Sequence, residues 1–296
     1  MKIKDSFHTY AIIAIVFWSL AYVFTRLALA HFSAFALGFL RYFIASGVLV
    51  MIVIAAKMKL PEKNDLKWFA LGGASGFFLY MITFNTGCET VTAATSSVII
   101  AASPIISALL GSFVYKEKLY PFQWLAIIIC FGGVVVLTLL DGIFTINTGI
   151  IYLLAAAILL SFYNLLQRKL TQKYSGLQTA AFSIFAGTIM LAIFLPDALP
   201  QAKTAPPSQL FYVGVMGVFS SALAYLAWSE AFAKTESISA VSNYMFVTPF
   251  LTTLLGFLIA QELPDLPTII GGITIVLGLL IFNFGAKLNF CLPAKK

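Results

Sequence analysis

Apolar residues run along this chain of 296 residues in long blocks, and polar residues gather between the blocks. A helix that spans a bilayer needs about 20 consecutive apolar residues. Ten blocks near that length cover residues 10–30, 33–55, 67–87, 93–114, 122–140, 148–168, 177–196, 209–232, 239–260 and 268–286. Lipid cannot satisfy open backbone groups, and the blocks lack the two-residue alternation of barrel strands. The pattern therefore predicts an all-α membrane protein with ten transmembrane helices.

Composition and charge support a membrane location. The chain is 61% hydrophobic and 10% charged, whereas a soluble domain carries about 25% charged residues. If the N-terminus lies in the cytoplasm, 15 of the 18 Lys and Arg residues fall on the cytoplasmic side, and Lys203 alone falls in an outer loop. This bias predicts that both termini are cytoplasmic, in a bacterial cytoplasmic (inner) membrane. The net charge of +7 is then a topology signal, and we expect no nucleic-acid partner.

The two halves of the chain resemble each other. An offset of 145 pairs Tyr80 with Tyr225, Pro104 with Pro249 and Glu117 with Glu262, and an offset of 142 pairs Ser19 with Ser161, Arg26 with Arg168 and Phe43 with Phe185. We predict one repeat over residues 1–142 and a second over 143–296. Because five spans per half is an odd number, the repeats should be inverted relative to each other. The first block also aligns with the internal sixth block, so we expect it to be retained as a span and not removed as a signal peptide.

Short motifs recur in the same order in both halves. The first copy reads Ala93-Ala94-Thr95-Ser96-Ser97, Ser103-Pro104-Ile105, Tyr115-Lys116-Glu117-Lys118-Leu119 and Gly132-Gly133-Val134-Val135. The second copy reads Ser239-Ala240-Val241-Ser242, Thr248-Pro249-Phe250, Gln261-Glu262-Leu263 and Gly271-Gly272. From Trp18 to about Phe284 the chain resembles the EamA-type branch of the drug/metabolite transporter superfamily. The resemblance implies ten helices in two inverted five-helix repeats and transport of small metabolites, often outward, without catalytic residues. It leaves the substrate open among amino acids, nucleotide-related compounds, choline-like cations and drugs.

Aromatic residues in the first half follow helical spacing. Trp18, Tyr22 and Arg26 are four residues apart and share one face of the first helix. Tyr80 and Phe84 share a face of the third helix in the same way. We interpret them as an aromatic wall with Arg26 as a cationic group, which suits an organic anion or zwitterion. The alternative is a lipid-facing aromatic belt with an interfacial arginine.

The second half offers matching candidates. Ser221, Tyr225 and Trp228 share a face of the eighth helix, and Tyr225 is the repeat mate of Tyr80. Uncharged polar groups in a membrane either bond between helices or line a wet cavity. We therefore add Asn164 and Asn243 as groups that hydrogen-bond the substrate. The alternative for the aromatic residues is ordinary packing.

Three further residues in the spans have candidate roles in conformational change or coupling. Pro104 and Pro249 lie mid-span in the fourth and ninth helices, where each removes a backbone hydrogen bond and kinks its helix. They are either shape kinks or hinges for alternating access. Glu230 is the one clear acid within a span, and it either pairs with Lys234 or couples transport to protons or recognises a cation. Outside the spans, Glu117 and Glu262 are expected to fix loops.

Other functional classes find little support. Cys88, Cys130 and Cys291 form no C-x-x-C pair, and His8 and His31 have no metal-ligand neighbour at i+4. No P-loop or hydrolase motif is present, so we expect neither an enzyme nor a cofactor or metal. The sequence favours a secondary transporter that moves a small organic metabolite, an amino acid and possibly an aromatic one, outward by alternating access. An organic-cation, choline-like or drug transporter using aromatic rings and Glu230 is the alternative. A passive channel is a further rival, and the oligomeric state stays open.

Overall fold

The computed structural model describes residues 6–116, 118–139, 147–234, 241 and 243–285, and every regular element in them is helical. The first half contains α1 (Phe7–Ala28), α2 (Ala34–Ala55), α3 (Leu66–Gly73), α4 (Tyr80–Cys88), α5 (Ala93–Ala101), α6 (Ser103–Val114) and α7 (Pro121–Leu139). A π-helical turn over Ala74–Leu79 joins α3 to α4. The predicted third span is therefore a helix with a widened middle turn.

The second half repeats this arrangement. It contains α8 (Thr148–Leu170), α9 (Gly176–Leu191), α10 (Leu195–Thr204), α11 (Pro207–Val215), α12 (Ala224–Ala233), α14 (Thr248–Leu255) and α15 (Leu266–Phe284). A π-helical turn over Met216–Leu223 joins α11 to α12, at the place that Ala74–Leu79 occupies in the first half. The helix α10 lies where the sequence predicted only a connection, because Pro196 starts a helical turn and Ala198 is fully buried.

Seven of the described helical segments are long and apolar enough to cross a membrane, and two shorter apolar helices cover 121–137 and 244–260. Their outer surfaces carry large apolar side chains such as Met51, Ile54 and Ile189, at 64, 70 and 75% exposure. A soluble monomer rarely exposes apolar surface on this scale. An apolar environment around the bundle accounts for it.

Polar residues between the apolar blocks start the helices. Ser6, Ser33, Thr92, Ser175 and Asp265 each accept a hydrogen bond from a backbone N–H in the first turn that follows. Such caps satisfy donors that have no partner within the helix. The polar residues in these gaps thus help to set where these five helices begin.

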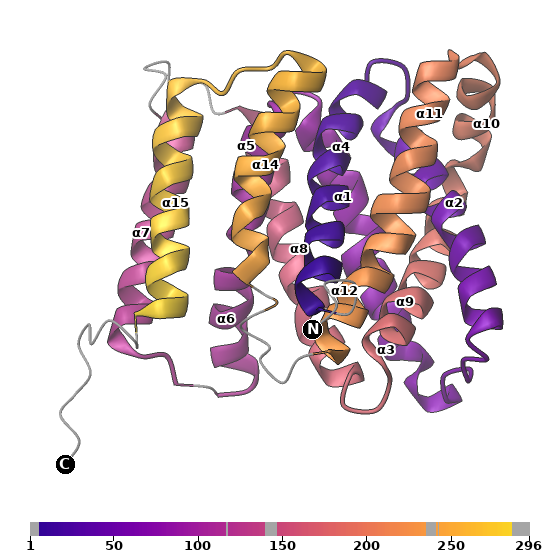
Figure 1. Cartoon of the computed structure of the whole chain (residues 1–296), viewed down its shortest axis with the longest axis horizontal. Coiled ribbons are helices and arrows are strands. Elements are labelled where there is room, and N and C mark those ends of the chain that lie inside the picture. The colour runs from indigo at the N-terminus through magenta and orange to yellow at the C-terminus, as the bar shows by residue number, and fades with distance from the viewer. Residues whose placement is uncertain (1–5, 117, 140–146, 235–240, 242, 286–296) are drawn as a thin grey trace.

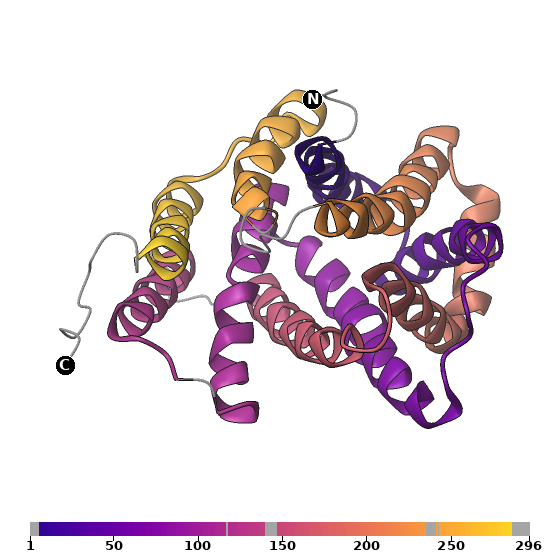
Figure 2. The same ribbon diagram turned by 60° about the horizontal axis from the view of Figure 1, so that its bottom comes forward.

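Each half packs on the other and forms no separate body. The helix α1 packs on α12, and its repeat mate α8 packs on α4, while α3 lies on α9 and α7 on α15. Figure 1 shows α7 and α15 side by side at one edge, and Figure 2 shows the same pair at the edge from a second direction. The interior of the molecule therefore lies between the halves, among α1, α4, α8 and α12.

The two ends of the bundle can be told apart in Figure 1. We call the end where α1 finishes the upper end, and the end where α1 starts the lower end. Thr90, just after α4, bonds Asn147, just before α8, at 2.9 Å, and Glu89 accepts a bond from Arg26 near the end of α1. Thus α8 begins at the upper end, where its repeat mate α1 finishes, and the two run in opposite directions.

Charged residues tie the connections together at the lower end. Lys173 Nζ lies 2.8 Å from Asp65 Oδ2 and 2.6 Å from Glu62 Oε2. Hydrogen bonds from Lys173 and Tyr174 hold the pKa of the Asp65 carboxyl below its usual value, and the same acids raise the pKa of Lys173. This cluster joins the α2–α3 connection to the α8–α9 connection.

Candidate functional site

A cavity of about 420 Å³ lies between the two halves, within the size range of small-molecule sites. Its walls come from α1, α2, α4, α5, α6, α8, α12, α14, α15 and the 3₁₀ turn before α14. Gln167, near the end of α8, and Gly176, at the start of α9, also line it. The cavity therefore runs from the middle of the bundle toward the lower end.

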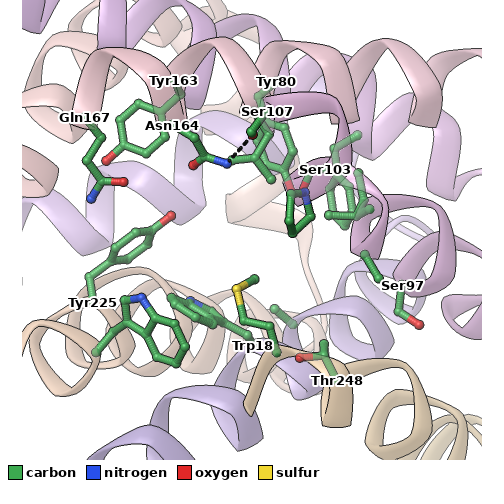
Figure 3. Close-up of a pocket in the computed structure, with 18 of the residues that line it drawn as sticks. Trp18, Tyr80, Ser97, Ser103, Ser107, Tyr163, Asn164, Gln167, Tyr225 and Thr248 are labelled. Carbon is green, nitrogen blue, oxygen red and sulfur yellow. Dashed lines mark hydrogen bonds between the residues drawn. The ribbon is translucent and has the colours of Figure 1, made fainter. Parts of the chain in front are cut away.

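Aromatic rings form one side of the cavity. The Trp18 ring lies 5.5 Å from Tyr225 and 5.1 Å from Trp228, measured between centroids. The Trp18 indole Nε1 donates to Ser220 O at 3.1 Å, which ties the ring to the π-helical turn before α12. Figure 3 shows Trp18 and Tyr225 on one side of the open space. Rings from both halves of the chain therefore meet at this side of the cavity.

A second aromatic group comes from the first half. Tyr22 meets Phe84 edge-on at 5.5 Å, and Tyr80 stacks on Phe84 at 5.5 Å. All three line the cavity. Tyr80 directly follows the π-helical turn in its helix, and Tyr225 follows the matching turn one residue later. Because π-helical turns change the facing of the residues after them and recur at functional sites, they help to turn both repeat-mate tyrosines inward.

Uncharged polar groups face these rings. Asn164 lines the cavity and donates from Nδ2 to Ser107 Oγ at 3.1 Å, which leaves its carbonyl oxygen without a protein donor among the described residues. Figure 3 shows Asn164 beside Tyr163, opposite Tyr225. Gln167 adds a second amide. A ligand in this space would meet flat apolar surfaces and a few hydrogen-bonding groups.

Arg41 supplies the charge, and the sequence argument did not propose it for the site. It lies on α2, lines the cavity and is 7% exposed. Its Nε donates to Ser221 Oγ at 2.6 Å. Ser221, which was predicted to bind substrate, is 0% exposed and is not a lining residue. The structure places it against Arg41 instead of at the cavity surface. The signal in the sequence was an arginine well inside an apolar block, which normally faces protein or water.

Arg26 lies outside this cavity. Its Nε is 3.2 Å from Glu262 Oε1, and its Nη1 donates to Cys88 O at 3.1 Å and Glu89 O at 2.6 Å. Ala93 N, at the start of α5, donates to Glu262 Oε2 at 3.0 Å. On α1 the cavity lining ends at Tyr22, one turn below Arg26. The arrangement places Arg26 in a junction at the upper end of the bundle, away from the aromatic residues that line the cavity.

Of the remaining residues that the sequence proposed, some line the cavity and others do not. Pro104 lines the cavity at the break between α5 and α6, and Pro249 is buried near the start of α14. Glu230 is exposed and does not line the cavity. The side chain of Asn243 and the whole of Glu117 lie outside the described residues.

Among the described lining residues Arg41 is the one charged side chain. No group of three His, Cys, Asp or Glu in the described chain is placed to hold a metal ion.

Comparison with known proteins agrees with this architecture. The model of the EamA-like transporter family matches the chain twice, over residues 6–139 and 147–284. The chain belongs to the EamA-like transporter family. The two matches flank residues 140–146, which the structure does not describe, so the predicted repeat boundary at 142–143 stays a prediction.

Proteins similar to this chain are named as transporters. The chain is 29% identical over 262 residues to the uncharacterized transporter YdfC of Bacillus subtilis, covering 88% of this chain and 85% of the relative. It is 26% identical over 272 residues to a probable terminal-alkyne amino-acid exporter of Streptantibioticus cattleyicolor, covering 92 and 91%. It is 24% identical over 259 residues to the S-adenosylmethionine uptake transporter of Rickettsia prowazekii, covering 86 and 84%.

A solved crystal structure shares the fold, with a TM-score of 0.65 at 19% identity, covering 96% of this chain and 99% of that chain. Together with the apolar helices, the family places this EamA-like protein in the cell membrane as a multi-pass transporter of small molecules. The family and the relatives' names point to transport and away from enzymatic catalysis.

Proposed function

We propose that this EamA-like protein is a secondary transporter that exports a small organic metabolite, an amino acid and possibly an aromatic one, across the cytoplasmic membrane by alternating access. The observation that carries the proposal is the cavity between the repeats, lined by rings from both halves and by one buried cation. Amino-acid-sized ligands suit its volume of about 420 Å³. The exporter from Streptantibioticus cattleyicolor supports the substrate class and the outward direction.

The proposed topology has ten spans, two inverted five-helix repeats and both termini in the cytoplasm. The lower end, with its lysine-rich connections, is then cytoplasmic, and the upper end, with the Arg26–Glu262 pair, is external. The cavity reaches toward the cytoplasmic end, so this state would receive substrate from the cell interior. Pro104 and Pro249, each at the first turn of a helix after a break, are the proposed hinges.

The organic-cation alternative lacks a counter-charge in the described cavity. Glu230 is exposed on α12, and the buried charge that lines the cavity is positive. A cationic ligand would meet repulsion from Arg41 where it needs an acid. The amino-acid reading is therefore the better supported one.

Counterflow in proteoliposomes tests the transport proposal. Vesicles preloaded with one unlabelled amino acid should take up the same labelled amino acid faster than empty vesicles, because a carrier returns faster when it is loaded. Each proteinogenic amino acid is tested singly, with choline and uridine alongside. Uptake without this stimulation would indicate a channel, and counterflow with choline alone would move the cation alternative ahead.

Tyr80→Ala should weaken substrate binding by about 1–3 kcal/mol, about 5–150-fold, because a cavity-lining ring loses its contact with the ligand. Tyr152→Ala is the matched control, since Tyr152 is 43% exposed on the outer surface of α8. Binding is measured by the rise in melting temperature with added amino acid. Equal binding by the two variants would remove Tyr80 from the site.

A further inference from the structure

Arg41 is a buried cation that pairs with no acid in the part of the chain that the structure describes. It lies about 10 Å along α2 from the helix start, counting seven residues at 1.5 Å each. Its side chain is 7% exposed, and no ion pair to it exists among the described residues. Burying an unpaired guanidinium is costly. A position that keeps such a group needs a partner that arrives from elsewhere.

The hydrogen bonds of Arg41 leave a recognition edge open. Nε donates to Ser221 Oγ at 2.6 Å, and the Cζ atom lies 5.6 Å from the centre of the Tyr42 ring. The two terminal NH₂ groups make no hydrogen bond to the described protein, although Arg41 lines the cavity. A guanidinium offers five N–H donors in a planar fork. With Nε held by Ser221, four donors on the two terminal nitrogens stay available to a ligand.

Arg26 is an arginine whose charge and hydrogen-bond donors are paired within this protein. It bonds the Glu262 carboxylate and two backbone carbonyls. Arg41 has one neutral hydroxyl in their place. The comparison separates a structural arginine at the upper end from one that faces the cavity with its charge uncompensated.

We infer that the terminal nitrogens of Arg41 bind the carboxylate of the transported substrate. This assignment rests on the proposed function and deepens it, because it limits the substrates to carboxylate-bearing anions and zwitterions. A planar carboxylate can accept two parallel N–H bonds from the Nη1–Nη2 edge. The rings of Tyr22, Tyr80 and Tyr225 then lie around the rest of the molecule in the same cavity. The Ser221 bond orients the guanidinium, so Ser221 is a positioning residue.

A charge-reporting cysteine tests the site without knowledge of the substrate. Ala101 lines the cavity, and Ala101→Cys is introduced after Cys88, Cys130 and Cys291 are replaced by serine or alanine. An anionic and a cationic methanethiosulfonate then compete for the thiol of the purified protein. Arg41→Gln should lower the ratio of anionic to cationic labelling rates by about tenfold, because the local positive potential is lost. An unchanged ratio would overturn the inference.

Substrate pairs test the chemistry directly. Each amino acid that raises the melting temperature is compared with its carboxamide. The wild type should prefer the acid by at least tenfold, and Arg41→Gln should abolish this preference. Arg41→Lys keeps the positive charge, and it replaces the glutamine variant in these tests if that variant does not fold. The lysine variant should keep the wild-type labelling ratio. It should bind the acid about tenfold more weakly, because an ammonium has no planar fork. Ser221→Ala should reduce the preference and leave the charge ratio unchanged.

The outcomes separate this inference from the proposed function. If no amino acid shows counterflow but the labelling ratio depends on Arg41, the amino-acid proposal fails and the anion site stands. If counterflow occurs and both Arg41 variants retain the wild-type preference for acids over amides, transport stands and the Arg41 assignment fails.

Discussion

Gly133→Val is expected to abolish the folded, monodisperse protein, whereas Gly132→Val is expected to leave it intact. A Cβ on Gly133 would lie 2.6 Å from Ile275 Cγ1 and 2.8 Å from the backbone oxygen of Gly271. The backbone oxygen cannot move without shifting α15. A Cβ on the adjacent Gly132 would meet nothing within 4 Å.

The clash at Gly133 is expected to have a large effect because α7 and α15 make few contacts with the rest of the bundle. Both lie at the edge of the bundle and pack chiefly on each other (Figures 1 and 2). In a membrane, helices associate through close approach at small residues, since lipid is as apolar as leucine. Overpacking costs about 1–3 kcal/mol or more in a close-packed contact.

Melting temperature and gel-filtration profile in detergent compare the two valine variants. They change neighbouring residues of one helix by the same side chain, so helix propensity is matched. If Gly133→Val does not express, Gly133→Ala introduces a smaller side chain at the same position and can be measured in its place. Identical stability at positions 132 and 133 would mean that the α7–α15 contact accepts a side chain.

Much of this architecture follows from the sequence pattern. The apolar blocks predicted helical segments in nearly the right places, and the family match over both halves confirms the duplication. Trp18, Tyr22, Tyr80 and Tyr225 all line the cavity, since helical spacing places residues on one face. The repeat also pointed to Tyr80 and Tyr225 as a pair, because their helices occupy matching places.

Helical spacing in the sequence does not predict how deep along the bundle a residue lies or which residue of another helix it contacts. Arg26 shares a face with Trp18, but eight residues carry it about 12 Å along the axis, past the upper limit of the cavity. Ser221 shares a helix face with Tyr225, but its hydroxyl bonds to Arg41 of α2 and does not line the cavity. That contact joins residues 180 positions apart. Arg41 lies well inside an apolar block, where an arginine is costly in a membrane, but the sequence alone could not show which cavity it faces.

The last expected result concerns the Arg26–Glu262 junction, which we predict to hold the upper end closed. Glu262→Gln and Arg26→Ala should each make the cavity more accessible from outside the cell. The pair joins α1 to the segment before α15, and Glu262 also holds the start of α5. Removing either partner breaks bonds that join three elements, and the side chains are only 34 and 21% exposed.

The size of the effect follows from this partial burial. Exposed ion pairs contribute about 0–1 kcal/mol and breaking a buried pair costs about 3–5 kcal/mol. A half-buried pair with charge-assisted bonds should then shift the closed state by about 1–2 kcal/mol, about 5–30-fold. Ala101→Cys, labelled in intact cells with an impermeant thiol reagent, reports it. Asp65→Asn is the control, because it breaks an ion pair at the opposite end and should leave external labelling unchanged.

Substrate selectivity distinguishes this junction from Arg41. Because Arg26 would act on the balance between closed and open states, Arg26→Ala should alter binding of an acid and its carboxamide by the same factor. A residue that binds the carboxylate directly would affect the acid alone, as expected for Arg41→Gln. If Arg26→Ala weakens acids selectively and external labelling does not rise, Arg26 contacts the substrate in another state of the cycle, and the role of the junction as a gate is wrong.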